Sequence, residues 1–132
     1  MSKKIIVIGL ILLGAGVLIM NSCTKTTTVL EDNTPAVTKT VSFSKDIMPI
    51  LATSCAKSGC HSGSVAPNLS AATAYNALAN GNFININTPK SSEVYLWLTG
   101  KRAIAMPAGS PNNPSNINAL MLAWITQGAK DN

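Results

Sequence analysis

The 132-residue chain has few charged side chains and very few aromatic ones. Charged residues make up 11% of the sequence and aromatic residues 5%, whereas about 25% of residues are charged in an average soluble domain. Chains that stay disordered or bind nucleic acid are usually more polar and more highly charged. The composition therefore argues against nucleic acid as a partner, and the length leaves room for one small domain with a tail or targeting segment.

Lys3 and Lys4 precede sixteen consecutive apolar or glycine residues at positions 5–20. A basic segment followed by a short apolar segment is typical of a secretory signal peptide. Because the run is shorter than the about 20 residues that a membrane-spanning helix needs, we predict a cleaved signal peptide at residues 1–22, with an uncleaved anchor as the alternative. Without the two lysines, eight basic residues face five acidic ones, so the remaining chain is mildly basic.

Cys23 directly follows the apolar run. Ser22 and Cys23 resemble the lipobox of bacterial lipoproteins, in which the cysteine becomes the lipidated first residue, although Met20 and Asn21 depart from the leucine and small residue that are common there. The resemblance implies an exported lipoprotein that faces the periplasm or the cell exterior. Its partner would be the membrane, because more than one acyl chain suffices for stable anchoring.

A threonine-rich tract without aromatic residues comes next. Residues 24–40 contain seven threonines and one proline, a composition typical of a linker. All six aromatic residues lie further along the chain, the first of them at position 43. We therefore predict a linker at residues 23–42 and a folded domain at residues 43–132, with its core beginning near Val41.

Apolar residues recur at helical spacing within this domain, and serine or aspartate caps and glycine stops separate the segments. We predict four helices, the first capped by Ser44 or Asp46 and ending near residue 54, and the others at residues 71–80, 93–99 and 116–127. Pro49 fits the first helix only within its first turn, where its missing N–H has no partner to lose. Only residues 83–87 alternate as a strand does. The expected fold class is all-α.

The remaining two cysteines lie beside the only histidine, in the order Cys55-Ala-Lys-Ser-Gly-Cys60-His61. A disulfide is one interpretation in an exported protein, but it would close a short loop with little effect on stability and leaves His61 unexplained. A zinc site lacks a nearby fourth ligand. Covalent haem is the third interpretation, because Cys-x-x-Cys-His is its attachment signature and the cysteine–histidine adjacency is kept here. Disulfide and haem both stay open on this motif alone.

Residues 43–130 as a whole resemble class I cytochromes c. In that family a helix precedes the attachment motif, a proline loop supports the histidine, a late loop supplies a methionine ligand, and a terminal helix packs on the first. The matching parts here are the helix before Cys55, the loop Ala66-Pro67-Asn68-Leu69, the pair Met106-Pro107, and residues 116–127. The longer cysteine spacer and Ala66, which replaces a glycine, depart from the family pattern.

The resemblance implies a small bundle of about four helices around one covalent haem c. Cys55 and Cys60 would attach the haem, His61 and Met106 would bind its iron, and the carbonyl of Pro67 would orient the imidazole. The other two methionines of the domain, Met48 and Met121, are expected on helices, and a core role is the better interpretation for Met121.

The implied function is a membrane-tethered monohaem cytochrome that transfers single electrons between redox partner proteins and is not an enzyme. Lys57, Lys90, Lys101 and Arg102 would steer a partner with an acidic docking patch, or are simply solvated surface charges. One alternative is a haem domain with an open sixth position for peroxide or ligand chemistry, which requires that Met106 does not bind iron. The other is a haem-free, disulfide-stapled lipoprotein that serves as a binding module.

Overall fold

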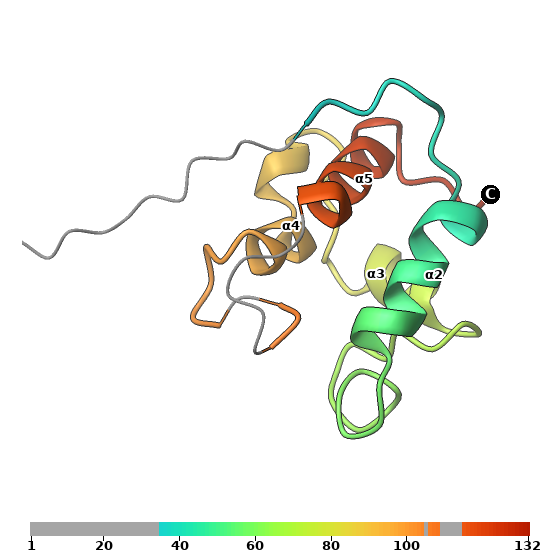
Figure 1. Cartoon of the computed structure of the whole chain (residues 1–132), viewed down its shortest axis with the longest axis vertical. Helices are drawn as coiled ribbons and strands as arrows, with labels where there is room; N and C mark the ends of the chain where they lie inside the picture. Colours follow the sequence, from blue (N-terminus) through green and yellow to red (C-terminus); the bar gives the residue numbers. More distant parts are fainter. Residues whose placement is uncertain (1–34, 105, 109–114) are drawn as a thin grey trace, which may run out of the picture.

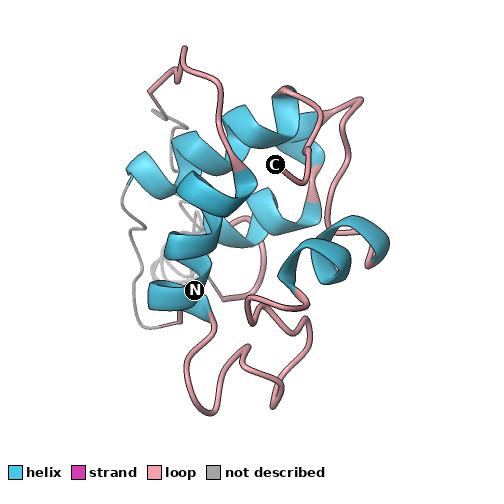
Figure 2. Ribbon diagram, turned by 90° about the vertical axis from the view of Figure 1, so that its right-hand side faces the viewer, coloured by secondary structure: helices cyan, strands magenta, loops and turns pink. Residues whose placement is uncertain are grey.

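The structure, a computed structural model, describes residues 35–104, 106–108 and 115–132. The predicted signal peptide, Cys23 and most of the predicted linker lie outside these residues. The described parts are helices joined by loops and contain no strand, so they agree with the all-α prediction, and residues 83–87 are a loop (Figures 1 and 2). None of the helices in these parts is long and apolar enough to cross a membrane.

The first helical segment, residues 43–55, begins earlier than predicted. It consists of a π-helical turn at Phe43–Ile47, the short helix α2 at Met48–Ile50 and a second π-helical turn at Leu51–Cys55. Ser42 caps it by accepting a hydrogen bond from the Lys45 backbone N–H, so the predicted start at residue 44 or 46 is wrong.

Pro49 lies in the middle of this segment, so the prediction that it fits only within the first turn is also wrong. It occupies the start of α2, where its missing N–H would interrupt an ordinary ladder of bonds to the fourth preceding residue. In the turn before it, the N–H of Met48 bonds instead to the carbonyl of Phe43, five residues earlier. The wider turns on both sides accommodate the interruption that proline imposes.

The later helices lie close to their predicted places. Helix α3 at Ala74–Asn80 starts three residues late, because residues 71–73 form a turn in which the Ser70 carbonyl accepts the backbone N–H groups of Thr73 and Ala74. Helix α4 at Glu93–Leu98 follows a 3₁₀ turn at Pro89–Ser91, and helix α5 spans Ser115–Thr126. Serine and glycine punctuation therefore locates α4 and α5 to within about a residue.

Three aromatic rings hold the first segment, α3 and α5 together. The ring centroid of Phe43 lies 5.4 Å from that of Tyr75 and 5.1 Å from that of Trp124, and Tyr75 and Trp124 are 6.4 Å apart. These are the tilted and edge-to-face arrangements that aromatic pairs prefer. Met121, on the same helix as Trp124, is 2% exposed, so its predicted core role is confirmed.

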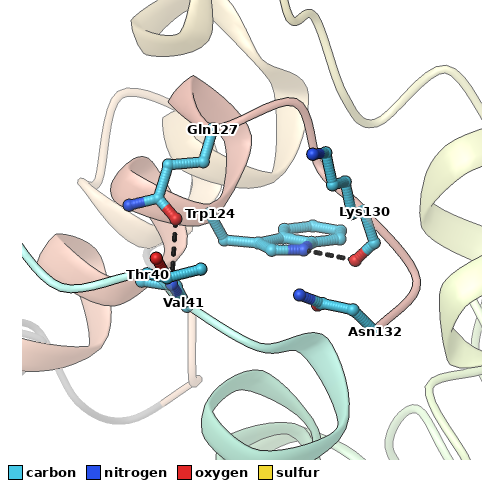
Figure 3. Close-up of a pocket in the computed structure, with 6 residues that line it drawn as sticks. All are labelled: Thr40, Val41, Trp124, Gln127, Lys130 and Asn132. Atoms are coloured by element: carbon cyan, nitrogen blue, oxygen red, sulfur yellow. Dashed lines mark hydrogen bonds between the residues drawn. The ribbon is translucent and has the colours of Figure 1, made fainter.

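Residues at the two ends of the domain are tied to each other (Figure 3). The side chain of Gln127 accepts a hydrogen bond from the Val41 N–H at 2.8 Å and donates one to the Lys39 carbonyl at 3.0 Å. The side chain of Asn132 accepts the Phe43 N–H. Val41 is 2% exposed and is the first buried residue in the described part of the chain. A cavity of about 310 Å³ lies at this junction, and no predicted site residue lines it.

The aromatic cluster predicts a large effect of truncating Phe43. Phe43→Ala should lower the free energy of unfolding by about 3–5 kcal/mol, because it leaves a cavity between the first segment and α5. Urea denaturation followed by circular dichroism measures this loss. Ile86→Ala is the control, since Ile86 is 56% exposed and should change stability by less than about 0.5 kcal/mol. Equal effects of the two substitutions would contradict the assigned role of the cluster.

Candidate functional site

The loop after the first helical segment folds back on the end of that segment. Cys55 is the last residue of its second π-turn, and the backbone N–H of His61 donates to the Cys55 carbonyl at 3.2 Å. Within the loop, the Cys60 N–H bonds to the Lys57 carbonyl, and Gly59 has a φ of +76°, a conformation that glycine adopts without strain. The four-residue spacer thus forms a closed turn that returns Cys60 and His61 to the helix end.

Both cysteines of this loop are free thiols in the structure. Cys55 is half-buried and Cys60 is exposed. Burial raises the pKa of the Cys55 thiol above its ordinary value, and the neighbouring Cys60 raises it further. The two thiols therefore differ in reactivity, with the thiolate form less accessible at Cys55.

The imidazole of His61 is oriented by two backbone carbonyls. Its Nδ1 lies 3.1 Å from the carbonyl oxygen of Pro67 and 3.2 Å from that of Val65. Carbonyl oxygens only accept hydrogen bonds, so we assign the ring proton to Nδ1. In the neutral tautomer with this proton on Nδ1, the lone pair is on Nε2, which is the arrangement of a metal-ligating histidine whose second nitrogen is held by the protein.

The loop that supports His61 is itself anchored in the core. The backbone N–H of Leu69 donates to the His61 carbonyl at 2.7 Å, and the Leu69 side chain is 6% exposed. The Val65 N–H donates to the Cys60 carbonyl at 3.0 Å. Residues 60–69 therefore form one hydrogen-bonded unit that places the Pro67 carbonyl beside the imidazole.

Met106 lies on a different segment, in the loop after α4. Its backbone N–H donates to the carbonyl of Trp97 at 3.1 Å, and the residue is half-buried. In Figure 1 this loop (orange) and the loop that carries His61 (green) both lie in the lower part of the molecule. Cys55, Cys60, His61 and Pro67 thus belong to one hydrogen-bonded unit of the structure. Met106 lies on another segment, the loop after α4, and is bonded to that helix through Trp97.

A network around Glu93 was missed by sequence reasoning. Its Oε1 accepts hydrogen bonds from the Trp97 indole N–H at 2.9 Å and from Arg102 Nε at 2.7 Å, and its Oε2 accepts one from Arg102 Nη2 at 2.6 Å. The Arg102 guanidinium holds the pKa of Glu93 below its usual range. Arg102, expected to be a steering charge or a solvated one, is therefore engaged in a bidentate ion pair.

Part of this network was visible in the sequence. Glu93 and Trp97 are four residues apart on a predicted helix, and such residues are neighbours on its surface. The return of Arg102 to Glu93 depends on the path of the following loop, which no local pattern indicates. Of the other basic residues predicted near the site, Lys57, Lys90 and Lys101 are all exposed.

Comparison of the chain with protein-family models, with curated proteins and with solved structures gave no match. Across the described ranges, no group of three or more histidine, cysteine, aspartate and glutamate side chains is placed to hold a metal ion. The predicted iron site uses a different donor set, one imidazole and one thioether. Two free thiols beside an imidazole with an available Nε2 fit the attachment and ligation that covalent haem requires.

The unequal burial of the two thiols gives a direct test of this part of the structure. In polypeptide made without haem attachment, iodoacetamide should alkylate Cys60 several-fold faster than Cys55, because burial and a raised pKa leave Cys55 with less accessible thiolate. Peptide mass spectrometry at timed intervals measures both rates. In strong urea the two rates should converge, and equal rates in the folded polypeptide would contradict the burial of Cys55.

Proposed function

We propose that this protein is an exported, membrane-tethered monohaem c-type cytochrome with a class I cytochrome c-like domain, and that it carries single electrons between redox partner proteins. The observation that carries the proposal is the orientation of His61. Its Nδ1 faces two carbonyl oxygens, so Nε2 is left as the ligating nitrogen. Two free cysteines flank the same loop, which matches the order of residues in a haem-attachment motif.

Each candidate residue has a distinct role in this proposal. Cys55 and Cys60 would form the thioether links, His61 Nε2 and the Met106 sulfur would bind the iron, and the carbonyl of Pro67 would keep the imidazole in one orientation. When bound, haem supplies an iron centre that exchanges one electron reversibly, and a thioether ligand favours its reduced state. If both His61 and Met106 bind the iron, no position on it would be open to a substrate, which favours a carrier over an enzyme.

The haem interpretation explains more of the site than a disulfide does. A disulfide between Cys55 and Cys60 would account for the two cysteines alone, whereas His61 is held at Nδ1 by carbonyls of the following loop. Such carbonyl bonds raise the basicity of the opposite nitrogen and fix its direction. A histidine without a ligand needs neither property, so the orientation of the ring supports metal ligation.

Location and partners are further parts of the proposal. Cys23 would be acylated after removal of residues 1–22 and would hold the protein on a membrane, facing the periplasm or the cell exterior. Lys57, Lys90 and Lys101 would attract the acidic patch of a redox partner. Because Arg102 is paired with Glu93, it contributes less to that attraction than an exposed lysine such as Lys57 or Lys101 does.

Intact mass tests whether haem is attached. Protein from a host with a working haem-attachment system should exceed the polypeptide mass by one haem, and the haem should survive acid-acetone extraction. Cys60→Ala should leave at most one thioether link, so only those molecules that fail to form this link should lose their haem in that treatment. A polypeptide-only mass of the unaltered protein in that host would contradict the proposed function.

Substitution of Met106 tests the sixth ligand. Met106→Ala should remove the weak sulfur-to-iron band near the red end of the oxidised spectrum, and lower the midpoint potential by on the order of 0.1 V or more within the roughly 0.8 V that axial ligands control. Met121→Leu is the matched control, because Met121 is in the core and a volume-conserving swap there costs under about 1.5 kcal/mol. An unchanged spectrum and potential in Met106→Ala would instead favour an open sixth position or another ligand.

A further inference from the structure

We infer that Glu93, Trp97 and Arg102 form a positioning network that holds the Met106 loop on α4 and thereby sets how readily the Met106 sulfur leaves the haem iron. The attachment of the loop to α4 by this network is argued from the structure alone. The effect of the network on the iron ligand rests on the proposed function.

The carboxylate of Glu93 is the centre of the network. It accepts three hydrogen bonds, one from the Trp97 indole and two from the Arg102 guanidinium, at 2.6–2.9 Å. The two guanidinium bonds form the parallel fork that arginine makes with carboxylates, and this fork fixes direction as well as distance. Arg102 is thereby held against a helix that begins nine residues before it.

Trp97 connects this carboxylate to the Met106 loop. Its indole N–H donates to Glu93, while its backbone carbonyl accepts the N–H of Gly100 at 3.2 Å and that of Met106 at 3.1 Å. The loop is therefore attached to α4 near its middle, through Arg102, and again at Met106. No other backbone hydrogen bond of Met106 is seen to residues in the described ranges.

Because the network lies on the surface, we expect it to affect the opening of the loop and not the stability of the whole domain. The side chains of Arg102 and Glu93 are 41% and 34% exposed, and exposed ion pairs contribute little to global stability. Local opening of a loop costs much less free energy than global unfolding. The small contribution of the Glu93–Arg102 pair is therefore a large share of the cost of opening this loop, and its loss changes the open fraction of the loop severalfold. The network should therefore affect Met106 while leaving the thermal midpoint of the domain nearly unchanged.

Hydrogen exchange measures the hold on the loop directly. In Arg102→Gln, the backbone amide of Met106 should exchange about two- to fivefold faster than in the unaltered protein, the range expected for loss of an exposed pair. Lys39→Gln is the matched control, because it removes one cation from another exposed pair, Lys39–Asp46, away from this loop. Glu93→Gln combined with Arg102→Gln should exchange no faster than either single variant, since both act on one network.

Imidazole binding to the oxidised haem protein measures the consequence for the ligand. Imidazole binds only when the Met106 sulfur has left the iron, so its apparent affinity reports how easily the sulfur leaves. Arg102→Gln should bind imidazole about two- to fivefold more tightly, with Lys39→Gln unchanged. A role in structure alone would change exchange without changing this affinity.

The two measurements separate the possible failures. Unchanged Met106 exchange in Arg102→Gln would overturn the hold on the loop. If Met106 exchanges faster in Arg102→Gln but the imidazole affinity of the haem-carrying protein is unchanged, the network does not control release of the Met106 sulfur. If the protein carries no haem, the proposed function fails and the ligand role fails with it, whereas hydrogen exchange still decides whether the network holds the loop.

Discussion

The candidate site depends on two carbonyl oxygens that face one nitrogen of His61. Neither Val65 nor Pro67 contributes a side chain to this contact, so the chemistry of the imidazole is decided by the path of the backbone. That path is held by the bond from Leu69 to the His61 carbonyl. The backbone of an apolar residue buried in the core therefore helps to set which nitrogen of the half-buried ring faces the two carbonyls.

The domain is small, and its cohesion comes from a few long-range links. Phe43, Tyr75 and Trp124 join three helical segments, and Gln127 and Asn132 tie the end of the chain to Val41 and to the start of the first segment. The loops of the site lie outside this set of contacts. A domain of this size buries a modest share of its surface. The loop that carries Met106 therefore depends on local hydrogen bonds such as those of Glu93 with Arg102, whereas Leu69 anchors the His61 loop in the core.

Capping serines and terminal glycines in the sequence predicted the helices whose ends they mark. Helices α4 and α5 were located from serine and glycine, whereas the start of the first segment was missed because the Pro49 rule assumes an α-helical ladder and says nothing of π-turns. The proximity of Cys60 and His61 follows from their adjacency in the chain. The Glu93–Arg102 pair could not be predicted, since it depends on the return of a loop. The placement of the predicted haem ligands relative to one another depends likewise on long-range packing.

The bonds of Gln127 to Lys39 and Val41 have a mechanical consequence. The described chain enters along the upper edge of the molecule in Figure 1, whereas the His61 loop lies at the lower end. A force applied at residue 35 is passed to α5 through these bonds and then to the aromatic cluster. The first helical segment lies between that load path and the His61 loop. Tension on the N-terminal end would therefore deform the junction of the two chain ends before it disturbed the ring of His61.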